Sequence, residues 1–223
     1  MLRLSTLICY PSDMVLKRRY HHGNLKPALL RAAVELIAEV GPAAFTLREV
    51  ARRAGISHNA PYRHFREKDE LLAAVATQGF QRLADALSKP AKATRAHNPN
   101  PALGRFQASG LAYVRFALRS PEHLLVMFDW PLAPDRYPEL SAAAKRAFSV
   151  LVGLVKGAQR EGSLPGGDPL ALARIAWSLV HGVAKLAIAK RLPFKSESKV
   201  LRFATHAIKT LYDGMGPKSA PLQ

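Results

Sequence analysis

The chain has 223 residues, of which 48% are hydrophobic, so it is long enough for one large domain or two small ones. Its formal net charge of +17 favours an anionic partner, such as nucleic acid, an anionic membrane surface or an acidic ligand. Cys9 is the single cysteine, which excludes an intramolecular disulfide and suits a reducing compartment.

The N-terminal 22 residues are expected to form a flexible basic arm, since residues 17–22 (K-R-R-Y-H-H) carry charge without a core pattern. Met14 lies just before this run and is an alternative start of translation. We expect no signal peptide, because the mildly apolar start lacks a dense basic cluster. No apolar run approaches the ~20 residues that a membrane helix needs, so we expect no membrane partner and a cytoplasmic location.

Helical periodicity dominates the next segment. Apolar residues recur along residues 25–40 at the spacing of one buried helix face, and Asn24 can cap this helix. Gly41 and Pro42 can end it. A helix is therefore predicted over Leu25–Val40.

Residues 45–65 predict two short helices joined by a tight turn. Thr46 precedes the first helix and Glu49 follows three residues later, which is a capping-box pattern. Gly55 can adopt the positive φ that ends such a helix, and Ser57 can cap the next one.

The second of these helices has an apolar and a polar side. It is expected to bury Phe65 fully and Tyr62 partly, and to use Pro61 for geometry. Its outward residues are His58, Asn59, Ala60, Arg63 and His64. A helix-turn-helix places such a second helix in the major groove of DNA.

The rest of the chain predicts longer helices. Residues 88–101 hold three prolines and form the expected loop or boundary, and Asp129–Pro138 forms a second loop. We expect an all-α fold with an arm (1–22), a DNA-binding domain (23–68), a larger domain (69–215) and a frayed tail (216–223). The predicted helices are Lys68–Leu87, Ala102–Leu118, Pro121–Met127, Glu139–Arg160, Pro169–Lys190 capped by Asp168, and Ser196–Tyr212.

The sequence resembles the tetracycline-repressor (TetR) family of regulators. Residues 44–72 are A-F-T-L-R-E-V-A-R-R-A-G-I-S-H-N-A-P-Y-R-H-F-R-E-K-D-E-L-L, and the match covers about 50 residues. Residues 177–182 (W-S-L-V-H-G) are similar to the signature of a subgroup with a WHG-type C-terminal domain, and residues 20–25 (Y-H-H-G-N-L) are typical of its start.

This resemblance implies an all-helical homodimer that binds double-stranded DNA. Asn59 could bond adenine and the Ala60 methyl could contact a thymine methyl. Thr46 could bind a phosphate, cap the helix or do both, and the basic arm could contact phosphates or stay solvated. The candidate DNA-binding residues are Arg18, Arg19, Tyr20, Thr46, Arg48, Ser57, His58, Asn59, Ala60, Tyr62, Arg63, His64 and Lys68.

The resemblance also implies a C-terminal effector pocket and a dimer seam. The pocket candidates are Phe106, Tyr113, Phe116, Met127, Phe128, Trp130, Trp177 and His181, and for each of them a place in the core is the commoner alternative. The seam candidates are Leu179, Gly182, Val183, Leu186, Leu201, Ala204, Ile208 and Leu211, with an intramolecular core as the alternative.

The leading functional hypothesis is a repressor released from a palindromic operator by a small effector. The positive charge of the C-terminal half, with Arg115 and Arg119 on one helix face, favours an anionic effector. The alternative is a nonspecific architectural DNA-binding protein without an effector. We expect no enzyme, metal or cofactor, because common catalytic motifs are missing and His181 has no ligand partner at suitable spacing.

Overall fold

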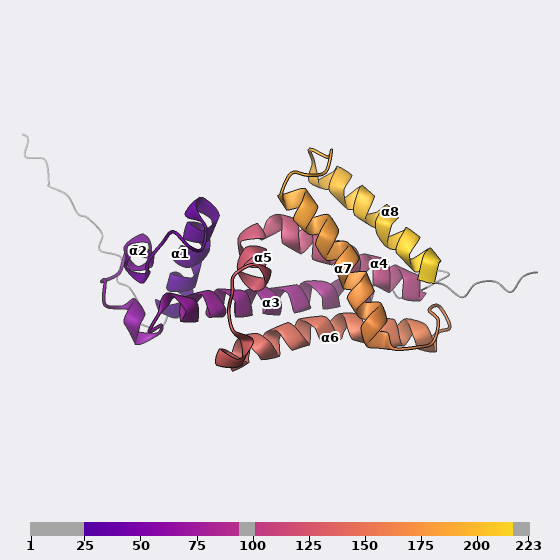
Figure 1. Ribbon diagram of the computed structural model, residues 1–223, viewed down its shortest axis with the longest axis horizontal. Coiled ribbons are helices and arrows are strands. Elements are labelled where there is room, and N and C mark those ends of the chain that lie inside the picture. Colours follow the sequence, from indigo (N-terminus) through magenta and orange to yellow (C-terminus); the bar gives the residue numbers. More distant parts are fainter. Residues whose placement is uncertain (1–24, 94–100, 216–223) are drawn as a thin grey trace, which may run out of the picture.

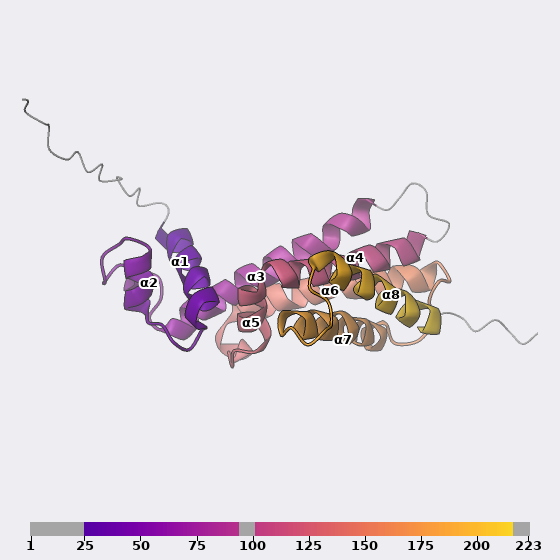
Figure 2. The same cartoon turned by 90° about the horizontal axis from the view of Figure 1, so that it is seen from above.

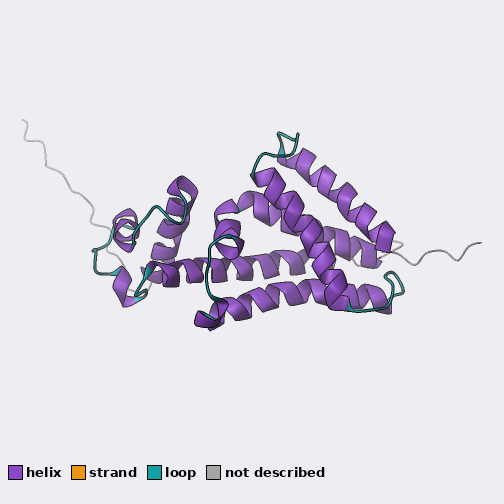
Figure 3. Ribbon diagram, in the orientation of Figure 1, coloured by secondary structure: helices purple, strands orange, loops and turns teal. Residues whose placement is uncertain are grey.

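A computed structural model describes residues 25–93 and 101–215 of the chain, and within these ranges the fold is entirely helical (Figure 3). The all-α prediction is therefore confirmed. The α-helices are α1 (Leu25–Val40), α2 (Leu47–Arg53), α3 (Lys68–Ala93), α4 (Pro101–Arg119), α5 (Pro121–Phe128), α6 (Pro138–Arg160), α7 (Pro169–Ile188) and α8 (Glu197–Met215). Two 3₁₀ turns, η2 (Pro61–Arg63) and η3 (Pro134–Arg136), complete the set.

Helix α3 is the helix that runs through both parts of the molecule. It begins in the small N-terminal unit of α1, α2 and η2, and continues between α4 and α6 (Figure 1). Helix α7 packs against α4, α6 and α8, while α8 also packs against α4. Figures 1 and 2 place α1 and α2 at one end of an elongated molecule and α8 toward the other.

The small unit and the larger helical body share one core. Leu29 of α1, Val50 of α2 and Leu72 of α3 are fully buried in the same cluster that continues to Ile208 of α8. Helix α1 also packs against α5. A displacement in the larger body can therefore reach the N-terminal unit through packed side chains.

Most predicted helix boundaries agree with the structure to within one or two residues. The two larger differences are at the C-terminal ends of α3 and α8, and α8 runs three residues past Tyr212 to Met215. Helix α3 runs six residues past Leu87, whose side chain is buried and favours continuation. Helix α7 ends at Ile188 rather than Lys190, because Lys190 adopts φ +55° and its N–H bonds Ala187 O. The predicted arm, the Asn24 cap and the tail 216–223 lie outside the described residues.

Helix α7 corrects the expectation that no segment approaches a membrane span. Among residues 25–93 and 101–215, α7 is the one helix whose length and composition would allow it to cross a membrane. Of its most apolar stretch, 28% is buried inside the protein. Helix α7 carries Arg174, His181 and Lys185. Helix α7 packs against three other helices, α4, α6 and α8.

Candidate functional site

The start of α2 is fixed by the predicted capping box. The Thr46 hydroxyl accepts a hydrogen bond from Glu49 N at 3.3 Å, and Thr46 N donates to Glu49 Oε2 at 2.7 Å. The same hydroxyl lies 3.0 Å from Glu49 Oε2, to which it donates. These bonds lower the pKa of Glu49, and they occupy the group that was considered for a phosphate.

The second short helix is not the α-helix that the sequence suggested. Residues 57–60 form turns, and only Pro61–Arg63 make a 3₁₀ turn whose N-cap is Ala60 without a side-chain bond. An α-helix capped by Ser57 would need a bond from the N–H of residue 61 to the Ser57 carbonyl. Pro61 has no N–H and its ring obstructs that carbonyl, so the helix cannot start there. The Ser57 cap was therefore wrong.

This turn nevertheless presents a polar surface. Phe65 is buried as predicted and Pro61 is buried as well, while Tyr62 is 48% exposed and so partly buried as expected. Gly55, at φ +68°, allows the tight turn before this surface. The exposed or partly exposed set is Arg48, Ser57, His58, Asn59, Ala60, Tyr62, Arg63 and His64.

An ion pair fixes α2 against α1. Arg53 donates to Glu39 from Nη1 at 2.7 Å and from Nη2 at 2.5 Å, and its Nη1 also approaches Glu35 Oε2 at 3.4 Å. The hydrogen bond from Arg53 holds the pKa of Glu39 below its usual value. The forked contact orients the turn surface relative to α1.

Lys68 was predicted to contact a DNA phosphate, and the structure gives it a different environment. Its Nζ donates to Ala43 O at 2.9 Å and to Phe45 O at 3.2 Å. The same atom lies 5.2 Å from the ring centroid of Phe45 and 5.4 Å from that of Trp130. Two of its three donors are thus used within the chain, and its contact with a DNA phosphate stays a prediction.

Trp130 was predicted to line the pocket, but it faces the N-terminal unit. Its Nε1 donates to Asp69 Oδ1 at 3.1 Å, beside its contact with Lys68. We call Lys68, Asp69 and Trp130 the interdomain bracket. Sequence reasoning missed it because residues 69 and 130 approach only through the packing of α3 and α5.

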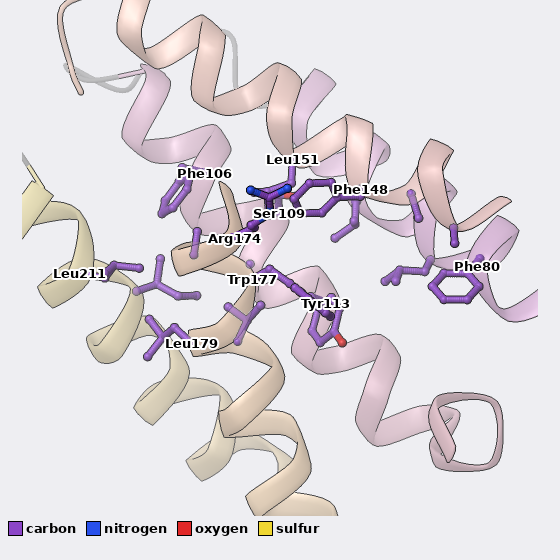
Figure 4. Close-up of a pocket in the computed structure, with 18 of the residues that line it drawn as sticks. Phe80, Phe106, Ser109, Tyr113, Phe148, Leu151, Arg174, Trp177, Leu179 and Leu211 are labelled. Carbon is purple, nitrogen blue, oxygen red and sulfur yellow. The ribbon is translucent and has the colours of Figure 1, made fainter. Parts of the chain in front are cut away.

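A cavity of about 430 Å³ lies within the larger body (Figure 4). Its size is within the usual range for small-molecule pockets, about 300–1,000 Å³. The lining residues are Phe80, Leu83, Leu87, Phe106, Ser109, Gly110, Tyr113, Phe128, Ala144, Ala147, Phe148, Leu151, Arg174, Ala176, Trp177, Leu179, Val180, Ile208 and Leu211.

The predicted pocket residues divide into two groups. Phe106, Tyr113, Phe128 and Trp177 line the cavity. Phe116 is instead buried in the core, and Met127 approaches Gly79 of α3. His181 and Trp130 also lie outside the lining, and sequence reasoning missed Ser109 and Arg174, which belong to it.

His181 supports the cavity wall from behind. The Tyr113 hydroxyl lies 2.7 Å from His181 Nδ1, and the His181 ring packs edge-on against Phe128 with centroids 4.8 Å apart. Burial raises the pKa of Tyr113, while burial and Lys185 lower that of His181. Both shifts favour the uncharged forms, so a neutral phenol is hydrogen-bonded to a neutral imidazole.

Arg115 and Arg119 were considered for an anionic effector, but both lie near Glu197 of α8. The Arg119 Nη2 is 3.0 Å from Glu197 Oε1, and the Arg115 Nε is 3.9 Å from the same atom. Neither arginine lines the cavity. Across the described ranges, no three His, Cys, Asp or Glu side chains gather in a way that could bind a metal ion.

The predicted seam residues also separate by burial. Val183, Ala204 and Ile208 are buried inside the subunit, so they are unavailable to a partner. Leu186 is 48% exposed. The partly buried remainder comprises Leu179, Gly182, Leu201 and Leu211, of which Leu179 and Leu211 line the cavity.

Two family models match the chain in two separate regions. The model for bacterial regulatory proteins of the tetR family matches residues 29–75. The model for a tetracyclin repressor-like C-terminal domain matches residues 106–211. The first match covers α2, η2 and the start of α3, and the second covers most of the cavity.

Two solved structures from Rhodococcus have the same fold as this chain. A protein of unknown function from Rhodococcus sp. RHA1 has 34% sequence identity and a TM-score of 0.78, over 90% of this chain and 100% of that chain. A tetR-family regulatory protein from Rhodococcus RHA1 has 21% identity and a TM-score of 0.68, over 87% of this chain and 98% of that chain, which establishes similarity of fold.

A shorter sequence match concerns the N-terminal unit. The HTH-type transcriptional repressor Rv3405c of Mycobacterium tuberculosis is 48% identical over 48 residues. This alignment covers 22% of this chain and 26% of that repressor. The match thus spans about a quarter of the curated relative.

Proposed function

Because this chain belongs to the TetR family of bacterial regulatory proteins, we propose that it is a homodimeric DNA-binding repressor released from a palindromic operator by a small effector. The observation that carries this proposal is the course of α3. Its first turn carries Lys68 and Asp69 of the interdomain bracket, and its later turns supply Phe80, Leu83 and Leu87 to the cavity. One rigid helix thus connects the polar turn surface with a ligand-sized cavity.

The turn surface suits contact with DNA. Asn59 can bond adenine through its amide, and the exposed Arg63 can contact a base or a phosphate. Tyr62 and His64 are exposed on the same turn and can bond phosphates. The basic arm of Arg18, Arg19 and Tyr20 would add phosphate contacts that need charge rather than a fixed shape.

Helix α7 offers a surface for a second subunit. Ile175 is 50% exposed, Leu186 is 48% exposed, and a side chain added at Gly182 would meet no other atom within 4 Å. These positions are seven and four residues apart, so they share one face of the helix. Exposed apolar residues on a long helix favour burial against a partner.

The interdomain bracket could transmit effector binding from the cavity to the DNA-binding unit. Phe128 lines the cavity and packs on Trp177 with ring centroids 5.8 Å apart. The next residue, Asp129, pairs with Lys185, and Trp130 follows it in the bracket. An effector that displaces Phe128 would move Trp130 relative to Lys68, and so favour an arrangement that fits the operator less well.

Repression, rather than activation, is supported by the relative Rv3405c, which is named a repressor. We also propose that the W-S-L-V-H-G segment places the chain in the WHG subgroup, with a cytoplasmic location. Across α7 this segment contributes Trp177 to the cavity and His181 to its support.

The test is selection of genomic fragments by the purified full chain at about 150 mM salt, followed by footprinting. A short palindromic site is expected, and His58→Ala should weaken binding to it at least tenfold. The matched control is His206→Ala, which removes an exposed histidine of α8. Fragments without a shared motif, bound equally by both variants with steep salt dependence, would favour the architectural alternative.

A further inference from the structure

The cavity has an uneven distribution of polar groups. Its walls are formed mainly by aliphatic and aromatic side chains, while Ser109, Tyr113 and Arg174 contribute polar atoms. None of the described residues that line it is Asp or Glu. The lining therefore carries a positive charge without a compensating negative one.

Two hydrogen-bond donors of this lining remain available to a ligand. Ser109 is only 1% exposed, lines the cavity, and makes no hydrogen bond with another described residue. Arg174 has no carboxylate partner among the described residues and is exposed, so its guanidinium lies where the cavity meets solvent. In Figure 4 its side chain projects toward Phe148 and Leu151. Tyr113 differs from both, since its hydroxyl is already hydrogen-bonded to His181 Nδ1.

These donors favour a particular kind of occupant. A wholly apolar molecule would fill the walls but leave the buried Ser109 hydroxyl without an acceptor. A carboxylate accepts several hydrogen bonds and matches the fork of an arginine. At the exposed Arg174 such a group could stay partly hydrated, which avoids the cost of burying an isolated charge.

We propose that the effector is an apolar monocarboxylate whose hydrocarbon part fills the cavity and whose carboxylate bonds Arg174 and Ser109. This inference rests on the proposed function, since it assigns a ligand class to the same cavity. It moves the anionic contact from Arg115 and Arg119, which are paired with Glu197, to Arg174.

The test uses decanoate and decanol as probes, because they share a ten-carbon chain and differ in charge. Binding to the full-length protein is measured by isothermal titration calorimetry and by tryptophan fluorescence, to which Trp177 in the cavity wall contributes. Decanoate should bind at least tenfold more tightly than decanol. Equal binding of the two probes, or no binding of decanoate, would overturn the proposal without any variant.

Variants locate the carboxylate. Arg174→Met should reduce decanoate affinity at least tenfold and leave decanol affinity unchanged, and Ser109→Ala should reduce decanoate affinity several-fold. Arg31→Met makes the same change on the exposed face of α1, away from the cavity, and should bind decanoate like the unaltered protein. Undiminished decanoate binding by Arg174→Met would overturn the assignment, and Arg174→Lys tests charge alone with partial binding expected.

The outcome can be separated from that of the proposed function, because no DNA is present in these titrations. If decanoate binds as expected but leaves the operator complex intact, the proposed ligand class is supported and the proposed release from DNA by this ligand is contradicted. If the protein binds a palindromic operator but prefers decanol, the regulator stands and the carboxylate assignment fails.

Discussion

Trp130 and Lys68 meet at the junction between the N-terminal unit and the larger helical body. The Lys68 Nζ lies 5.4 Å from the Trp130 ring centroid and also donates to two carbonyls of the loop before α2. The neighbouring Asp69 accepts the Trp130 indole hydrogen at 3.1 Å. This lysine consequently connects the end of α5 with the backbone that positions the capping box.

Replacing Lys68 with methionine tests whether its charge stabilises the fold or contacts DNA. The variant keeps an apolar stem beside the two rings but loses the bonds to Ala43 O and Phe45 O. We expect the free energy of unfolding, measured by urea denaturation, to fall by about 1–2 kcal/mol. The salt dependence of DNA binding should stay unchanged, whereas loss of a phosphate contact would lower its slope by about 0.9.

The control for that experiment is Arg63→Met, which removes an exposed cation from the turn surface. It should leave unfolding nearly unchanged and lower the salt slope. A Lys68→Met protein of normal stability with a reduced slope would show that Lys68 contacts phosphate and that the bracket contributes little.

The capping box predicts a second measurable effect. Thr46→Ala removes the hydroxyl that accepts from Glu49 N, so we expect the free energy of unfolding to fall by about 1 kcal/mol. Thr46→Ser retains the hydroxyl and should restore most of it. If Thr46→Ala weakened DNA binding while urea unfolding stayed the same, Thr46 would be a phosphate contact rather than a cap.

Local chemistry explains which parts of the fold could be predicted from the sequence. The bounds of α1 and the capping box of Thr46 and Glu49 depend on residues within one or two turns, and both were predicted correctly. The second short helix was wrong because the apolar pattern outweighed a local constraint that was also visible. Pro61 cannot donate the bond that an α-helix capped by Ser57 requires.

The cavity and the bracket depend on contacts between distant segments. Trp130 and His181 are residue types that often line pockets. Their side chains are instead oriented by hydrogen bonds to Asp69 on α3 and Tyr113 on α4. Arg174 resembles any solvated helix residue in the sequence, and only the packing of α7 on α4 and α6 brings it to the cavity. The spacing of residues within one helix cannot predict these contacts between helices.

The partly buried imidazole of His181 predicts a pH dependence of stability. Its pKa in the folded protein is lowered from 6.5 by burial and by Lys185, so the unfolded chain binds a proton first as the pH falls. The free energy of unfolding should therefore be highest above about pH 6.5 and decrease as the pH falls through 6.5 toward the folded pKa. Urea unfolding between pH 8 and pH 5 measures this change.

A variant isolates the contribution of His181 from that of other histidines. His181→Gln cannot titrate, so the decrease below pH 6.5 should be smaller in this variant than in the unaltered chain. His206→Gln removes an exposed histidine and should leave the decrease in place. An identical pH profile for His181→Gln would mean that the imidazole does not titrate differently in the folded state.

Leu186 tests the subunit contact proposed for α7. Leu186→Glu places a charge on the exposed apolar face that also carries Ile175 and Gly182, and burial of an unpaired charge in an interface is costly. We expect analytical ultracentrifugation to show a shift from dimer to monomer with an unchanged helical circular dichroism spectrum. Leu170→Glu makes the same change at a 42%-exposed leucine on another face of α7, and it should remain dimeric. If Leu186→Glu stayed dimeric and Leu170→Glu became monomeric, the dimer interface would lie on the other face of α7. The two turn surfaces of the dimer would then be oriented differently toward DNA.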